Sequence, residues 1–234
     1  MENNTKTQTI SRVDEGLRQH MIKIYNYMTG GLIATAISAY AVLYTSLGSL
    51  FFTPTGLSGL GYIAIFAPLA MAFAFGPMIN RASIGKLNGF FWAFAVVMGI
   101  SLAPVLAAYT GTSVTRVFLI SAATFGAMSL YGYTTKKDLT GWGSFLFMGL
   151  IGIIIASIVN IFMGSEGMSF VISLLAVAIF VGLTAYDTQK IRDSYNENDS
   201  EDIAQRKVIA GSLNIYLDFI NLFVYLLRLL GERK

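Results

Sequence analysis

Two carboxylates, Asp187 and Asp218, stand out in a sequence whose long apolar stretches are otherwise nearly free of charge. They lie in or against the last two of seven such stretches. A carboxylate at membrane depth is costly, and it is usually retained because an ion, a proton or a reaction needs it. Two carboxylates in contact cannot both ionise cheaply, so they titrate as a coupled pair. Such a pair can sense pH, bind a hard cation such as Ca²⁺, or act as an aspartyl protease dyad.

The last apolar stretch carries a polar stripe. Its polar residues are spaced four, three, four and three positions apart, which places them on one face of a helix. They are Asn214, Asp218, Asn221, Tyr225 and Arg228. We expect this stripe to turn away from lipid and the helix to be surrounded by the others. The two asparagines can equally serve as hydrogen-bonding contacts between helices.

Asp187 follows Tyr186 near the end of the sixth stretch. No helix breaker occurs in residues 188–192, so we expect the helix to continue past Asp187. As the last two helices are antiparallel neighbours, the two carboxylates can meet in the cytoplasmic half of the bundle. The alternative is that Lys190 or Arg192 neutralises Asp187 near the membrane surface.

Composition identifies the class of protein. The 234 residues are 55% hydrophobic and only 12% charged, and the mean hydropathy is +0.63. A soluble domain carries about a quarter charged residues, so an all-α polytopic membrane protein is expected. The chain has no cysteine, and its one histidine, His20, lies in a polar segment. This composition argues against a charge-relay hydrolase and a histidine-based metal site, and we expect neither catalytic residues nor a cofactor.

The apolar stretches divide the chain into a polar amino-terminal segment, 1–23, and one integral membrane domain, 24–234. No cleavable signal peptide is visible in the first segment. Each stretch has about the 20 residues that a membrane-spanning helix needs. The expected helices cover residues 24–47, 59–79, 87–109, 115–133, 143–163, 168–187 and 208–230.

Basic residues indicate the orientation. With the amino terminus in the cytoplasm, twelve of the sixteen Lys and Arg residues fall on the inner side, as the positive-inside rule requires. The three at the carboxyl end fall outside if all seven stretches cross, so either the last helix crosses against the rule or one stretch is re-entrant. The net charge of +3 follows from residues that flank the membrane, and we expect no nucleic-acid partner.

Three segments resemble the bacterial members of the transmembrane Bax-inhibitor-motif family. They match in order and spacing, and the resemblance extends over about residues 15–234. The segments are LNIYLDFINLFVYLLRLLG (213–231), FVGLTAYDTQKI (180–191) and FGAMSLYGYTTKKDLTGWG (125–143).

The resemblance implies a seven-helix fold in the bacterial inner membrane with the last helix at the centre. It also implies a pH-sensitive, Ca²⁺-permeable leak that an aspartate pair controls, and these aspartates fall on Asp187 and Asp218. Lipid, Ca²⁺ and protons would be the partners. Residues around the pair or along the pore would be Tyr186, Asn214, Asn221 and Tyr225. Some members carry a basic latch in the second helix; here residues 61–79 lack Lys and Arg, and Arg81 is the nearest candidate.

Three other readings compete with a leak. Presenilin-type proteases also place a Tyr-Asp pair in their sixth helix, but their Gly-x-Gly-Asp motif is replaced here by Ile215-Tyr-Leu-Asp218. A retinal protein needs a lysine in the last helix, and residues 209–230 contain none. A regulator that binds a protease complex or a cell-death factor without transporting ions is the third reading.

Overall fold

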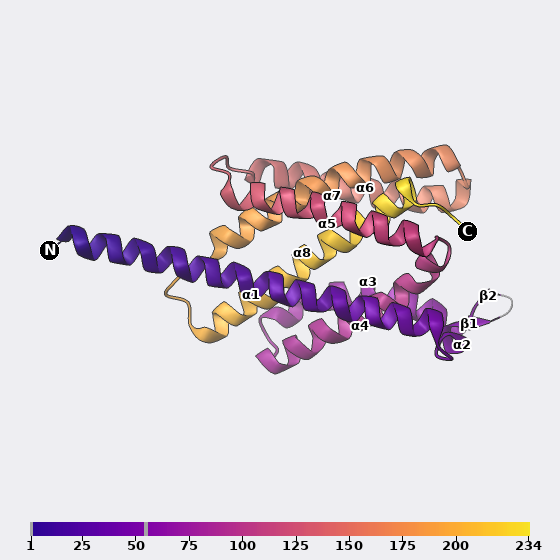
Figure 1. Cartoon of the computed structure of the whole chain (residues 1–234), viewed down its shortest axis with the longest axis horizontal. Coiled ribbons are helices and arrows are strands. Elements are labelled where there is room, and N and C mark those ends of the chain that lie inside the picture. Colours follow the sequence, from indigo (N-terminus) through magenta and orange to yellow (C-terminus); the bar gives the residue numbers. More distant parts are fainter. Residues whose placement is uncertain (1, 54–55) are drawn as a thin grey trace. The chain divides into compact units, whose positions relative to one another are not determined.

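The computed structural model describes the backbone of residues 2–53 and 56–234, and the side chains from residue 15 onward in those ranges. The chain is almost entirely helical (Figure 1). The long helices are α1 (Glu2–Tyr44), α3 (Gly59–Ile79), α4 (Ile84–Ala107), α5 (Gly111–Thr134), α6 (Thr140–Met163), α7 (Glu166–Ser194) and α8 (Glu201–Leu230). A short helix α2 (Gly48–Phe51) and the antiparallel pair β1 (Phe52–Thr53) and β2 (Gly56–Leu57) lie between α1 and α3, with Phe52 opposite Leu57.

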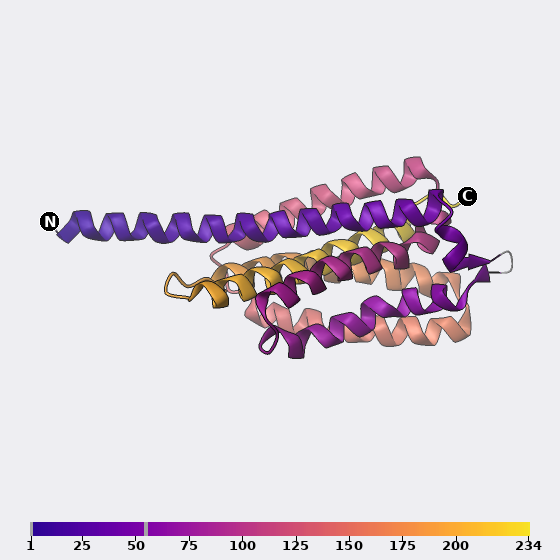
Figure 2. The same ribbon diagram turned by 90° about the horizontal axis from the view of Figure 1, so that it is seen from below.

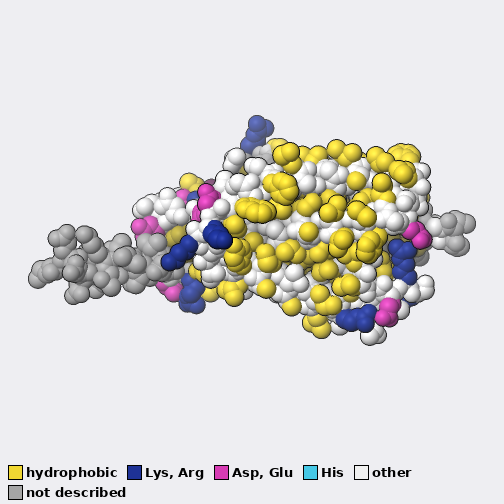
Figure 3. Space-filling view, turned by 90° about the horizontal axis from the view of Figure 1, so that it is seen from above, with side chains coloured by type: hydrophobic (Ala, Val, Ile, Leu, Met, Phe, Trp, Pro, Cys, Tyr) yellow, Lys and Arg dark blue, Asp and Glu magenta, His cyan; other side chains and the backbone are white. Residues whose placement is uncertain are grey.

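Seven helices in the described part of the chain are long and apolar enough to cross a bilayer, which confirms the prediction of an all-α polytopic membrane protein. Large hydrophobic side chains are exposed along them, as lipid contact requires. On the face that Figure 3 shows, hydrophobic side chains cover the middle, and most of the visible Lys, Arg, Asp and Glu side chains lie towards its left and right margins. Helical hydrogen bonding satisfies most of the polar backbone of the spans, although Pro68, Pro77 and Pro104 inside α3 and α4 donate none.

Several helices extend beyond their apolar stretches. Helix α7 runs seven residues past Asp187, to Ser194, and α8 begins at Glu201. The continuation of α7 past Asp187 was expected from the lack of a breaker, and residues 195–200 alone connect the two helices. Likewise, α1 includes residues 15–23, which the sequence reading left in a separate polar segment. Hydropathy marks where a helix lies in lipid, whereas a helix ends where capping and turn residues end it.

The chain forms two compact units. Unit one contains the residues up to Ala107 together with Tyr195–Leu213, and unit two contains Ala108–Ser194 together with Asn214–Lys234. Helix α8 thus contributes its first half to unit one and its second half to unit two. The central position of α8 within a seven-helix bundle stays a prediction.

Unit one is built on the close approach of α1 and α4 (Figure 2). At Gly99 a Cβ atom would overlap the Thr35 carbonyl and the Ser38 hydroxyl, so only glycine lets the two backbones come so near. The hydroxyl of Thr35 donates to the Ala95 carbonyl at 2.9 Å, and Ser38 donates to the Val96 carbonyl at 2.9 Å. Small residues and hydroxyl groups are the usual means of packing helices in lipid, where helices gain no hydrophobic energy from association.

We predict that Gly99→Ala destabilises unit one by about 1–3 kcal/mol, because the added methyl forces the backbones of α1 and α4 apart. The thermal unfolding midpoint in detergent measures this. Gly89→Ala in the same helix is the matched control, since nothing lies within 4 Å of its Cβ position. Equal midpoints for both variants would show that the α1–α4 contact is loose.

Candidate functional site

Helix α7 presents Asp187 from a segment that α5 and α6 hold closely on two sides. At Gly132 of α5 a Cβ would overlap the Ala185 backbone, and at Gly143 of α6 a Cβ would overlap the Tyr186 ring. Both contacts lie within unit two. The residues directly before Asp187 are therefore held by two close contacts, one to the Ala185 backbone and one to the Tyr186 ring, and each needs a glycine opposite it.

Polar contacts fix the residues directly after Asp187. The Thr188 hydroxyl hydrogen bonds to the Ser129 hydroxyl of α5 at 2.9 Å, and both residues are buried. Gln189, also buried, accepts from the Leu139 backbone N–H at 2.8 Å and donates to the Lys137 carbonyl at 2.8 Å. One side chain thus satisfies a donor and an acceptor of the α5–α6 connection.

Arg192 continues this attachment one turn further on. Its guanidinium donates to the carbonyls of Tyr133 at 2.8 Å and Thr135 at 3.0 Å, at the carboxyl end of α5, and it pairs with Asp193 at 2.8 Å. A cation there satisfies carbonyls that have no helical partner and opposes the negative end of the helix dipole. Arg192 is therefore engaged by α5 and Asp193, and it is no partner for Asp187.

The α5–α6 connection has its own polar anchor in Asp138. Its carboxylate accepts from the Thr140 backbone N–H at 2.8 Å, at the start of α6. Hydrogen bonds from the side chain and backbone of Thr140 lower the pKa of this exposed carboxyl, so the anchor is ionised at neutral pH.

The carboxyls of Asp187 and Asp218 lie within hydrogen-bonding contact of each other in unit two. Asp218 is only 5% exposed. Its Oδ2 atom receives no hydrogen bond from any conventional donor in the described part of the chain. A hydrogen bond between two carboxyls exists only while they share a proton, because two carboxylates are both acceptors. The structure thus places a carboxyl of α7 against a carboxyl of α8.

Compensating charge near this pair is sparse. Among the described side chains neither carboxyl takes part in a salt bridge. Lys190 acts on Asp187 through space, and its Nζ atom lies 5.9 Å from the centroid of the Tyr186 ring. Within the described residues no third His, Cys, Asp or Glu joins the pair to make a metal-ligand cluster.

Aromatic rings pack the second half of α8 against its neighbours in unit two. Phe219 meets Phe118 and Phe125 of α5 edge-on, with ring centroids 5.4 and 5.5 Å apart. Tyr225 stacks on Phe180 of α7 at 6.0 Å. Edge and stacked ring contacts add to the area they bury, so they hold the helix backbone that carries Asp218 in register.

The rest of the polar stripe behaves differently from the expectation. Asn214 is exposed, which departs from a stripe that turns wholly inward. Asn221 donates to the Leu217 carbonyl of its own helix at 2.9 Å, and the Arg228 guanidinium lies over the Tyr225 ring at 5.3 Å. Of the five stripe residues, only Asp218 is brought into contact with Asp187.

Arg81, the candidate latch, is exposed at the turn after α3 in unit one. A different arginine occupies the end of that helix. Arg206 of α8 donates to the carbonyls of Ile79 at 2.6 Å and Ala82 at 2.8 Å, and it pairs with Asp202 at 2.6 Å. The sequence did not predict this contact, because every residue has a backbone carbonyl and the residue type therefore does not show which carbonyls bind an arginine.

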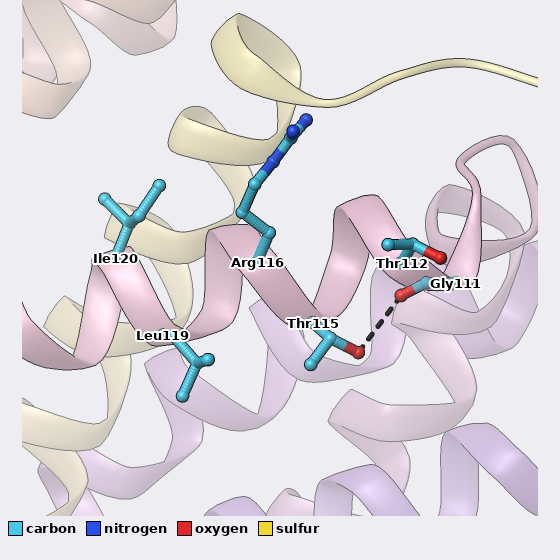
Figure 4. A pocket seen from close by; sticks show the side chains of 6 residues that line it. All are labelled: Gly111, Thr112, Thr115, Arg116, Leu119 and Ile120. Atoms are coloured by element: carbon cyan, nitrogen blue, oxygen red, sulfur yellow. Dashed lines mark hydrogen bonds between the residues drawn. The ribbon is translucent and has the colours of Figure 1, made fainter.

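A shallow pocket lies on the first turns of α5, lined by Gly111, Thr112, Thr115, Arg116, Leu119 and Ile120. Figure 4 shows that Arg116 and Leu119 point away from opposite sides of the helix, so the lining does not converge on one point. Arg116 is moreover paired with Glu232 at 2.9 Å.

That ion pair belongs to a docked carboxyl-terminal tail. Lys234 donates to the Ala108 carbonyl at 3.0 Å, and Thr110 donates to the Glu232 carbonyl at 3.0 Å. The tail therefore lies at the end of unit two where α5 begins.

Together these features define a multi-pass, all-α membrane protein with paired acidic groups on two of its spans. Residues 17–234 match the family model described as Inhibitor of apoptosis-promoting Bax1. The chain belongs to this Bax-inhibitor family.

Relatives in several bacteria agree over almost their full lengths. Protein RP147 of Rickettsia prowazekii is 44% identical over 98% of this chain and 96% of its own. The inner membrane protein YbhL of Escherichia coli is 40% identical over the whole of both chains. A protein of Caulobacter vibrioides is 42% identical over 95% of this chain and 92% of its own.

We predict that Gln189→Leu destabilises unit two by about 1–3 kcal/mol, because it leaves the Leu139 N–H and the Lys137 carbonyl without partners. Hydrogen exchange over residues 135–139, together with the unfolding midpoint in detergent, measures this. Gln189→Glu is the matched variant. It keeps the acceptor for Leu139, and it should therefore lose less than Gln189→Leu. Unchanged exchange in the leucine variant would contradict the role of Gln189.

Proposed function

We propose that this chain is a pH-sensitive leak for Ca²⁺ in the bacterial inner membrane, gated by protonation of Asp187 and Asp218. The observation that carries the proposal is the contact between the two carboxyls, one of them almost fully buried, on helices that each cross the membrane. Membership of the Bax-inhibitor family and the inner-membrane relative YbhL support the class and the location. No catalytic role is assigned to any residue.

The gating argument follows from charge. At low pH the two carboxyls share a proton, and the hydrogen bond between them favours the observed packing of α7 against α8. As pH rises, the last shared proton leaves, and two negative charges in contact oppose that packing. A change of a few kcal/mol between two packings is enough to redistribute their populations. The contact is thus favoured at low pH and weakened at high pH.

Calcium enters this proposal as cargo. Ca²⁺ takes six to eight oxygen ligands, and a carboxylate pair supplies only part of such a shell. A strong resident site would hold the ion and prevent passage, whereas two carboxylates favour a cation that keeps part of its water. The absence of a third acidic or histidine ligand among the described residues suits passage rather than storage.

The amino terminus is proposed to lie in the cytoplasm. This orientation puts the basic ends of α7 and the start of α8 on the inner side, in agreement with the positive-inside rule. The docked tail and the start of α5 then lie on the outer side. The Arg116–Glu232 pair gives one of the outer basic residues a local partner.

We predict that Asp218→Asn makes Ca²⁺ entry into proteoliposomes nearly independent of pH between 5 and 8. An amide keeps the size of the carboxyl and loses its titration. Asp187→Asn should do the same, because both groups are needed for the shared proton. Asp138→Asn is the matched control, since this carboxyl lies outside the pair, and it should keep the wild-type pH profile.

If both pair variants retained the full wild-type profile, the contact would be structural. A wild-type protein that passes no Ca²⁺ at any pH would instead favour the regulator that restrains a partner without transport.

Arg81 is proposed as the basic latch of this leak. Replacing it with alanine should change the size of the flux at a fixed pH by severalfold, because a latch shifts the population of closed and open packings. Lys86→Ala, in the next helix of unit one, is the control. Equal fluxes for the Arg81 variant and the control would remove Arg81 from the mechanism.

A further inference from the structure

The only histidine of the chain is buried against the connection that joins α7 to α8. His20 of α1 is 6% exposed, and its ring centroid lies 5.5 Å from that of Tyr195, the first residue after α7. Its Nε2 atom is buried and has no hydrogen-bond partner in the described part of the chain. All of these residues belong to unit one. A buried imidazole nitrogen without a partner is the kind of group whose protonation state a structure controls.

Tyr195 is seated in a notch on α1. A Cβ atom at Gly16, one turn before His20, would overlap the Tyr195 hydroxyl, so the tyrosine fits only because this residue is glycine. The other end of the connection is held by an ion pair between Asp199 and Lys207 of α8, at 2.5 Å. Residues 195–200 are thus docked at two points, and His20 forms one wall of the first.

Burial is the main factor that favours neutral His20, because a proton would place a charge where water is largely excluded. Lys207 of α8 and Lys23 on its own helix also oppose protonation, whereas Asp199 of the connection favours it but is already paired with Lys207. Tyr195 is the titratable ring that faces His20. Burying a charge without a dedicated partner is costly.

We propose that neutral His20 holds the α7–α8 connection docked on α1, and that its protonation releases Tyr195 and residues 195–200. The docked arrangement is complete at the pH where His20 is neutral, and it is lost as pH falls through the titration of the imidazole. Histidine is the side chain that changes charge between about pH 5 and 8. This site is separate from the acidic pair, and its pH dependence has the opposite sign: acid weakens the docking but favours the carboxyl contact.

Because the chain has a single histidine, its titration can be followed directly. Full-length protein with isotope-labelled histidine, in detergent, gives one imidazole signal by NMR between pH 5 and 8. Hydrogen exchange by mass spectrometry over residues 195–200 is measured on the same samples. We expect the loss of exchange protection to have the same midpoint as the imidazole titration. If the pKa of the imidazole differs by one unit between the docked and the released state, the equilibrium constant for docking changes about tenfold across the titration.

His20→Gln is the decisive variant, because glutamine cannot be protonated. At each pH, exchange in this variant is compared with that in the wild type, which removes the intrinsic pH dependence of exchange. The exchange rate of the wild type divided by that of the variant should be near one at pH 8. At pH 5 this ratio should rise to about ten or more, because only the wild type loses protection. Tyr195→Phe keeps the ring contact with His20, so it should retain the pH dependence.

Gly16→Ala tests the notch itself. The added methyl should displace the Tyr195 hydroxyl and release the connection at every pH, whereas Gly85→Ala, with open space at its Cβ position, should not. Two results would overturn the proposal: an imidazole that titrates with no change in exchange over 195–200, or a pH-dependent loss of protection that persists in His20→Gln. Neither readout involves Ca²⁺, so failure here is distinct from failure of the leak.

Discussion

A buried carboxyl in lipid needs a partner, and the partner of Asp218 is another carboxyl. Two carboxylates are both acceptors, so a hydrogen bond between Asp187 and Asp218 requires a shared proton, and this requirement is the basis of the proposed gating. Much of unit two supports that arrangement. The backbone of α7 is clamped on both sides of Asp187, and aromatic rings on both sides of α8 position Asp218. If these contacts did not hold the two helices, the carboxyls of Asp187 and Asp218 would move apart instead of sharing a proton.

The two halves of α8 are held by different chemistry. In unit one its side chains hydrogen bond to other helices: Arg206 caps α3, Gln205 reaches the Tyr27 hydroxyl, and Ser212 donates to the Ile24 carbonyl. In unit two its second half packs through aromatic rings around one polar contact. Hydrogen bonds to backbone carbonyls hold the first half of α8 by their direction, whereas preferred ring geometries hold the second half. Asp218 is therefore positioned by apolar packing, with the Asp187 carboxyl as its polar contact.

The sequence predicted the number of spans and the class of protein, because both rest on hydropathy. The functional role of the two aspartates stays a prediction. The sequence located helix ends poorly. The apolar stretches stop short of the helices, since α7 runs on to Ser194 and α8 already begins at Glu201. The lack of a breaker after Asp187 did predict that α7 continues, but not that residues 188–194 attach it to α5 and its connection. Gln189 and Arg192 gave no signal, since their partners are backbone groups more than fifty positions away along the chain. For Asn214 the sequence predicted a contact that is absent, because helical periodicity placed this residue inward and the structure leaves it exposed.

Unbroken helix joins the docked connection to both members of the acidic pair. Helix α7 continues from Asp187 to Ser194, and α8 from Glu201 to Asp218, which at a rise of about 1.5 Å per residue gives rods of roughly 10 and 25 Å. The α7 segment contains no proline, whereas the α8 segment contains Gly211 and Ser212, a type of pair at which helices kink. A connection docked at Tyr195 and Asp199 holds the amino-terminal end of α8 within unit one. Release of that connection would leave the contacts of α7 with α5 and α6 intact, because those contacts lie within unit two.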